Sequence, residues 1–133
     1  MWNCIKTAIQ GKSHIVDNTP CQDKVFSLNY NDNCIVSLAD GAGSAKYSHL
    51  GAEAVTKFIC HDIDRNFEQY FKEEDGFVIK KFLIQNIQQL LQSVAEYNNC
   101  TINDLASTLL MVAIKNDNFI IIHILFPLCY FCC

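Results

Sequence analysis

The spacing of apolar positions changes repeatedly along the chain, and each change predicts a different element. Residues 25–30 and 34–39 are short, mostly apolar runs, and Asn31-Asp32-Asn33 between them is typical of a tight turn. The two runs therefore predict a β-hairpin. Residues 2–10 predict a strand before it, and residues 11–20 a polar loop.

From Ser48 the apolar spacing becomes helical. Apolar residues recur every three or four positions, and Glu53 and Lys57 form a favourable pair one helical turn apart. Glu73-Glu74-Asp75-Gly76 interrupts the pattern, and residues 77–97 predict a second helix. The positions expected to face the core in this second helix are Val78, Phe82, Leu83, Ile87, Leu90, Leu91 and Val94.

Strand patterns return after the second helix. Residues 105–114 are an apolar run typical of a central strand, Lys115-Asn116-Asp117-Asn118 predicts a turn, and residues 119–124 predict a second buried strand. Strands followed by helices and then by strands predict an α+β layered domain rather than alternating parallel units.

Composition narrows the class of protein. The 133 residues are enough for one domain, 50% are hydrophobic and 18% are charged, which is typical of a globular chain. The net charge of −4 and the absence of a basic stripe argue against a nucleic-acid partner. Residues 119–133 are nearly all apolar but fall short of the roughly 20 that a membrane span needs, so no membrane partner is expected. No export signal begins the chain, and its eight cysteines are interpreted as reduced thiols of a cytoplasmic protein.

The most informative chemistry follows the run at residues 34–39. Asp40 places a carboxylate at the end of a buried strand, and Gly41 and Gly43 let a ligand approach the backbone. Asp23 stands at the start of the neighbouring strand. Carboxylate and carbonyl oxygens suit Mg²⁺ or Mn²⁺, so two acids on neighbouring strands predict a shared metal site.

Other interpretations of the glycine stretch fit less well. A dinucleotide-binding turn needs a third glycine where this chain has Lys46. A phosphate-binding loop needs Gly-Lys-Ser/Thr after four intervening residues, and the glycine stretch at residues 41–51 does not continue in this way. A tight turn capped by Asp40, with no ligand, remains the structural alternative.

Several motifs, taken in order, resemble one family. They are Gly11-Lys12-Ser13-His14, Pro20-Cys21-Gln22-Asp23, Leu38-Ala39-Asp40-Gly41-Ala42-Gly43-Ser44, Gly51-Ala52-Glu53 and Ser107-Thr108-Leu109-Leu110. The set resembles the N-terminal half of PPM-type metal-dependent serine/threonine protein phosphatases (protein phosphatase 2C-like), and is closest to their compact bacterial branch. The resemblance implies an α+β fold, a layered α-β-β-α sandwich of antiparallel sheets flanked by helices.

The resemblance also implies residue roles. Asp40 would bridge two Mn²⁺ or Mg²⁺ ions, Gly41 would offer its carbonyl to one, and Asp23 would hold a metal through water. Metal-activated water would then attack the phosphorus of phosphoserine or phosphothreonine in a phosphoprotein substrate. Asp23 and Asp40 are thus the expected catalytic residues, and Asp23, Asp40 and Gly41 the expected metal ligands.

The chain departs from the family pattern in two places. Asn18 lies in the stretch where an arginine would grip the substrate phosphate, and the last strand runs into Leu125-Phe126-Pro127 instead of Gly-Asp-Gly. We therefore expect residues 1–124 to be the N-terminal portion of a phosphatase domain and residues 125–133 an aberrant apolar tail, from a truncation or frameshift that removes two downstream metal aspartates.

Two expectations follow from this truncated pattern. The activity would be impaired or absent, and the alternative function is a non-catalytic remnant or protein-interaction module. Loss of half of each sheet would expose strand edges, which favours self-association through those edges.

Overall fold

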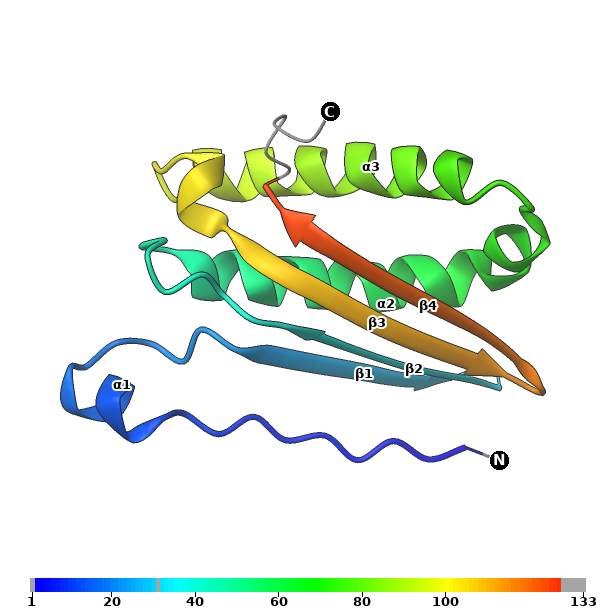
Figure 1. Cartoon of the computed structure of the whole chain (residues 1–133), viewed down its shortest axis with the longest axis horizontal. Coiled ribbons are helices and arrows are strands. Elements are labelled where there is room, and N and C mark those ends of the chain that lie inside the picture. The colour runs from blue at the N-terminus through cyan, green and yellow to red at the C-terminus, as the bar shows by residue number, and fades with distance from the viewer. Residues whose placement is uncertain (1, 31, 128–133) are drawn as a thin grey trace.

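A computed structural model describes residues 2–30 and 32–127, and its two long helices cover one face of a four-stranded sheet (Figure 1). The elements in chain order are α1 (Lys12–Val16), β1 (Lys24–Tyr30), β2 (Asn33–Ala39), α2 (Ser48–Lys72), α3 (Gly76–Tyr97), the 3₁₀ turn η1 (Ile102–Leu105), β3 (Ser107–Lys115) and β4 (Asn118–Phe126). The α+β class is confirmed. Within the described residues the layers are one sheet and one pair of helices, so a second sheet of a sandwich does not occur there.

The sheet has the order β1-β2-β3-β4, and every neighbouring pair is antiparallel. The two predicted hairpins are confirmed, although Asn31 of the first turn lies outside the described residues. The helices α2 and α3 are inserted between β2 and β3, yet these strands pair directly, with Val36 opposite Val112. The middle of the sheet therefore joins segments that are far apart in the sequence.

The core lies between the sheet and the helices. Alternate residues of β3 are buried, as expected for a strand with one covered face. The buried stripe of α3 has a four-residue spacing, and its members are Leu83, Ile87, Leu91 and Ala95. The prediction that Val78 and Phe82 face the core is wrong, because both lie beside this narrow stripe and stay exposed.

Close packing of α2 onto η1 depends on Gly51. A Cβ atom at this position would lie 2.0 Å from the carbonyl oxygen of Leu105. Such a distance is far below van der Waals contact, so only glycine lets the first turns of α2 approach the η1 backbone this closely.

Three sequence-based element predictions need correction. Residues 2–10 form no strand, and Ile5 is 98% exposed, because this segment has no alternating apolar face to bury. Residues 11–20 contain the short helix α1. The last strand continues beyond Ile124 to Phe126, which is buried opposite Ser107. Residues 128–133 of the expected tail lie outside the described residues.

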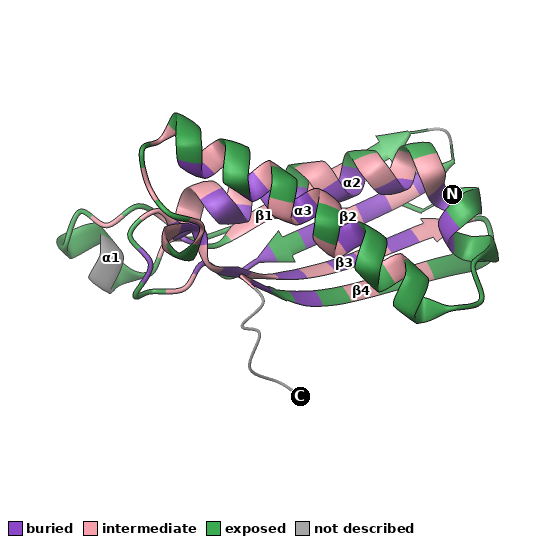
Figure 2. Cartoon of the chain, turned by 90° about the horizontal axis from the view of Figure 1, so that it is seen from above, coloured by how far each residue is buried: buried purple, intermediate pink, exposed green. Residues whose placement is uncertain are grey.

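The face of the sheet turned away from the helices is called the outer face below (Figure 2). Its side chains alternate with the buried ones along each strand. They are Val25, Ser27 and Asn29 of β1, Cys34, Val36 and Leu38 of β2, Thr108, Leu110, Val112 and Ile114 of β3, and Phe119, Ile121, His123 and Leu125 of β4. No helix in the described part of the chain has the length and apolar character needed to cross a membrane.

Burial of Cys60 predicts a loss of stability in alkali. Desolvation raises the pKa of this thiol from 9.0 to about 11. The hydrogen bond to Ser37 lowers the same pKa, but by less than desolvation raises it. The folded chain thus keeps the proton to a higher pH than the unfolded chain does. The resulting stabilisation is complete below pH 9.0 and is lost as the pH rises through about 11. The loss amounts to at most about 2.7 kcal/mol.

Urea unfolding measured across this pH range checks the prediction, with Cys60→Ala as the comparison. Tyr70 also has a raised pKa, through desolvation and its hydrogen bond to Asp62, so some alkaline loss will persist in the variant. Identical pH profiles for the two proteins would contradict the assignment to Cys60.

Candidate functional site

The backbone around Asp40 is held by the strand that follows it in the sheet. The Asp40 amide donates to Thr108 Oγ1 at 3.0 Å, and the Thr108 amide donates to the Asp40 carbonyl at 2.9 Å. Gly41 forms an isolated antiparallel bridge with Ser107, and the Ala42 amide donates to the Ala106 carbonyl at 2.9 Å. The turn after β2 is therefore a fixed extension of the sheet, and the Asp40 side chain is exposed at its end.

Gly41 permits two other segments to approach this turn. A Cβ atom there would lie 2.8 Å from the Gln22 carbonyl oxygen and 2.9 Å from both Cβ and Oγ of Ser48. Real Cβ atoms do not tolerate such contacts, so the segment before β1 and the start of α2 meet at a position that only glycine can fill. The neighbouring Gly43 is not constrained in this way, since its nearest contact would be Gln22 Oε1 at 3.9 Å.

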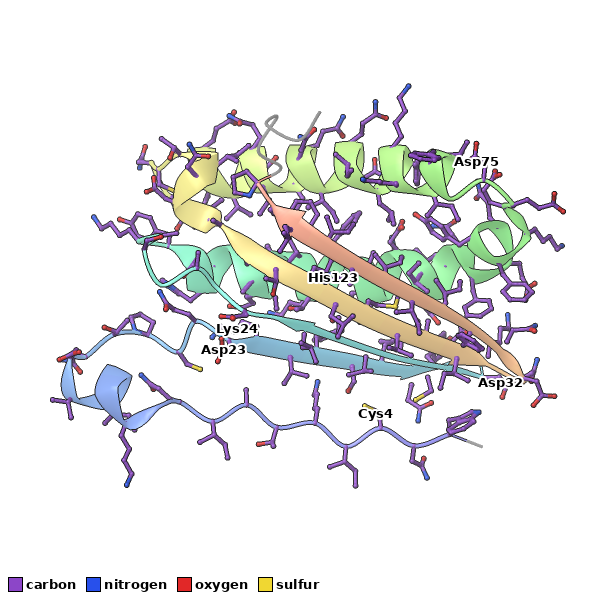
Figure 3. All side chains as sticks on the ribbon, viewed as in Figure 1. Cys4, Asp23, Lys24, Asp32, Asp75 and His123 are labelled. Atoms are coloured by element: carbon purple, nitrogen blue, oxygen red, sulfur yellow. The ribbon has the colours of Figure 1, made fainter. Side chains whose placement is uncertain are left out.

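The hairpin register sets Asp23 opposite Asp40. Lys24 pairs with Ala39, and the next step of the same register matches Asp23 with Asp40. One step further on, the Gln22 carbonyl oxygen lies 2.8 Å from the position that a Cβ atom of residue 41 would take, so the two segments stay close beyond the last ladder pair. Opposed residues on antiparallel strands share one face, so both carboxylates lie at the same end of the sheet, where β1 begins. Figure 3 shows Asp23 at this end, just before β1.

Charged and titratable groups of the first turns of α2 lie near Lys24. Desolvation, with a smaller contribution from the charge of Lys24, lowers the pKa of His49. The hydrogen bond from Lys57, 2.5 Å long, is the main cause of a lowered pKa at Glu53, and Lys24 adds to it. The predicted Glu53–Lys57 pair is thereby confirmed. Lys24 thus places its positive charge near the start of α2, on the face of the sheet opposite to the one that Asp23 and Asp40 share.

A shallow pocket of about 260 Å³ opens at Asp40. Its lining includes Gly41, Thr108 and Leu125. Two hydroxyl groups around Gly41, those of Ser48 and Ser107, are buried without a hydrogen-bond partner. Unsatisfied buried hydroxyls are uncommon, and here they lie beside the turn that presents Asp40.

The donor set is suited to one hydrated divalent cation. Asp23 and Asp40 supply two carboxylates and Gly41 a carbonyl, and Mg²⁺ is commonly held by one or two carboxylates with water in the remaining positions. Among the described residues no group of three or more His, Cys, Asp or Glu side chains could hold a metal ion. These residues therefore do not fit a centre of two cations, which would need more negative ligands.

The three residues predicted as metal ligands come together at one end of the first hairpin. Sequence reasoning missed the hydroxyl of Thr108 as the group that holds the Asp40 backbone, and it missed Ser48 as a neighbour of Gly41. The signals for Thr108 were its place in the family-like motif Ser107-Thr108-Leu109-Leu110 and its hydroxyl in an otherwise apolar strand.

Comparison with known proteins identifies the family. A family model described as protein phosphatase 2C matches residues 10–124. No curated protein and no solved structure gave a significant match. The matched segment contains the first hairpin, both long helices, the Asp23–Asp40 site and all but the last two residues of the second hairpin. It spans well over half of the 133 residues. The chain belongs to the protein phosphatase 2C family.

Proposed function

We propose that the chain is the metal-binding first portion of a serine/threonine protein phosphatase domain, and that Asp23 and Asp40 together hold one Mn²⁺ or Mg²⁺ ion. The placement of the two carboxylates across from each other in the hairpin register is the observation that supports this proposal most directly. Family membership adds a phosphoprotein as the class of substrate.

The chemistry of such a site is phosphate ester hydrolysis. A bound divalent cation would supply positive charge against the phosphoryl oxygens and would acidify a water molecule. Asp40, fixed through Thr108, and Asp23, fixed by the contact of Gln22 with Gly41, would orient that cation. The role of the chain itself is thus to preorganise two carboxylates on a rigid sheet end.

Residues 1–133 by themselves are proposed to have little or no phosphatase activity. Two carboxylates neutralise one divalent cation, whereas the family mechanism uses two cations. We expect hydrolysis of a phosphoserine peptide by the 133-residue chain in Mn²⁺ to match that of Asp40→Asn. Clear Mn²⁺-dependent turnover that Asp40→Asn abolishes would contradict this expectation.

Metal binding by the wild-type chain should appear as added stability. At a Mn²⁺ concentration ten times the Kd, linkage raises the free energy of unfolding by about 1.4 kcal/mol. Asp40→Asn should remove this gain, because it removes one of the two carboxylates. The measurement is urea unfolding with and without Mn²⁺.

Asp117→Asn is the matched control for this experiment. Asp117 is an exposed aspartate in the turn between β3 and β4, so its substitution changes the net charge equally without touching the site. It should keep the Mn²⁺ gain in full. If Mn²⁺ leaves the wild-type chain unchanged, the metal-binding proposal is wrong and the alternative, a protein-interaction module, is favoured.

A further inference from the structure

The two long helices form a groove on the side that is turned away from the sheet (Figure 2). This α2–α3 groove has a volume of about 480 Å³. Its lining consists of Ala54, Lys57, Phe58, His61, Asp62 and Arg65 of α2 and Leu90 of α3. None of these residues belongs to the buried stripes with which the helices face the sheet. Because the helices are the outermost layer of an α-β-β-α sandwich, a second sheet on the outer face would leave this groove open.

Three side chains of α2 that can carry positive charge form a row along the groove. Lys57, His61 and Arg65 follow one another at intervals of four residues, so they lie on one side of the helix about 6 Å apart along its axis. Lys57 pairs with Glu53. Arg65 is exposed, and no ion pair in the described part of the chain uses its guanidinium group. The donors of this group are therefore available to a carboxylate from outside the chain.

The acid nearest to this row in the lining does not take up Arg65. Asp62 is the single acidic residue of the lining, and one of its oxygens accepts a hydrogen bond from Asn66 Nδ2 at 3.2 Å. The other accepts from the Tyr70 hydroxyl at 2.5 Å. The Asp62 carboxylate is therefore held by residues further along α2, and Arg65 keeps its charge for another partner.

The wall that α3 contributes to the groove is uncharged. No Asp, Glu, Lys or Arg occurs from Phe82 to Ala95, and the exposed residues within one turn of Leu90 include Gln89 and Ser93. A surface helix normally presents charged residues to solvent, whereas the centre of a protein interface is depleted of them. Together with the half-buried rings and methyl groups of Phe58 and Leu90, the uncharged wall favours an interaction surface over a solvated one.

We propose that the α2–α3 groove binds an acidic amphipathic helix of a partner protein. Apolar side chains of that helix pack on Phe58 and Leu90, and a carboxylate at its flank pairs with Arg65. A helix is favoured over an extended segment because helical residues alone line the groove, and a bound helix satisfies its own backbone hydrogen bonds. The proposal requires neither metal binding nor phosphatase activity.

The acidic character of the partner follows from charge complementarity. Lys57 and Arg65 supply positive charge at the groove, although the chain as a whole has a net charge of −4. An acidic helix is therefore repelled by most of the surface and attracted at this row, which gives the contact its specificity. A basic helix would be attracted to the chain in general but would face Arg65 with a like charge.

The test is peptide binding by the full 133-residue chain, measured by fluorescence anisotropy. The probe is a labelled helical peptide about five turns long, with a leucine stripe and glutamates on both flanks. Salt at about 0.15 M screens the long-range repulsion between the peptide and the chain. Wild type should bind this peptide, and glutamine in place of its glutamates should raise the Kd at least about tenfold.

Arg65→Glu should also raise the Kd for the glutamate peptide at least about tenfold. Because Arg65 is exposed, circular dichroism should show an intact fold. The same variant should bind a peptide with lysines in place of the glutamates more tightly than wild type does, since the new carboxylate restores an ion pair. If Arg65→Glu unfolds, Arg65→Gln replaces it and should also weaken the binding of the glutamate peptide.

Lys81→Glu is the matched control. Lys81 is exposed on α3 and lies outside the lining of the groove, so this variant changes the net charge equally and should bind both peptides as wild type does. A wild type that does not bind the glutamate peptide overturns the proposal. Equal binding by wild type and Arg65→Glu also overturns it, and would assign the peptide to another apolar surface. Binding to phosphatidylserine vesicles without binding to the peptide overturns it as well, and would assign the row to a lipid surface.

Discussion

Replacing Gly51 by alanine is expected to lower the free energy of unfolding by more than about 3 kcal/mol. The new Cβ atom would lie 2.0 Å from the Leu105 carbonyl oxygen and 2.8 Å from its carbonyl carbon. Both atoms belong to the backbone, so no side-chain rotation relieves the overlap. Either α2 or η1 must move, and both pack against the buried side of the sheet. Urea unfolding followed by circular dichroism measures the effect.

Gly76→Ala provides the control for this prediction. Gly76 begins α3, and a Cβ atom there would meet nothing within 4 Å. The same substitution at this position should be neutral, or should stabilise the chain by about 0.5–1 kcal/mol through the lower entropy of the unfolded state. Equal effects at the two glycines would show that the approach of α2 to η1 is looser than described.

The second large effect is expected for Gly41→Ala, with a loss of about 3 kcal/mol in the free energy of unfolding. The added methyl group would contact the Gln22 carbonyl oxygen at 2.8 Å and Ser48 Cβ at 2.9 Å. Relief of these contacts requires the segment before β1 to move away from the turn. Asp23 follows Gln22 directly, so Asp23 should also move away from its position across the hairpin from Asp40. The variant should therefore show no gain in stability with Mn²⁺.

Gly43→Ala separates this steric effect from a general loss of glycine in the turn. Its Cβ atom would lie 3.9 Å from Gln22 Oε1, an ordinary van der Waals contact. We expect wild-type stability within about 0.5 kcal/mol and an unchanged response to Mn²⁺. A Gly41→Ala protein that keeps the full Mn²⁺ response would show that Gly41 does not set the distance between the two carboxylates.

Local patterns predicted most of the elements, because each of these carries its own signal. The turns at Asp32 and Asn116 have positive φ values of 62° and 54°, and Asp and Asn tolerate this conformation better than most residues. The long helices follow from apolar spacing. By contrast, the exposure of Val78 and Phe82 depends on how narrow the contact between α3 and α2 is, which is a tertiary property.

The candidate site was predictable in its residues but not in its construction. Asp23 and Asp40 could be expected on neighbouring strands, because the hairpin turn fixes which strands pair. The need for glycine at position 41 arises from Gln22 and Ser48, and the bond that holds Asp40 comes from Thr108, far along the chain. Contacts between distant segments leave no periodic signal in a single sequence.

The insertion of α2 and α3 between two adjacent strands also bears on the order of assembly. The β1–β2 and β3–β4 hairpins and the α2–α3 pair each form from neighbouring segments, whereas the pairing of Val36 with Val112 must close a loop that contains both helices. Closing a long loop costs more entropy than closing a tight turn. The Asp40–Thr108 contact belongs to this late step, so the site is completed only when the two halves of the sheet join.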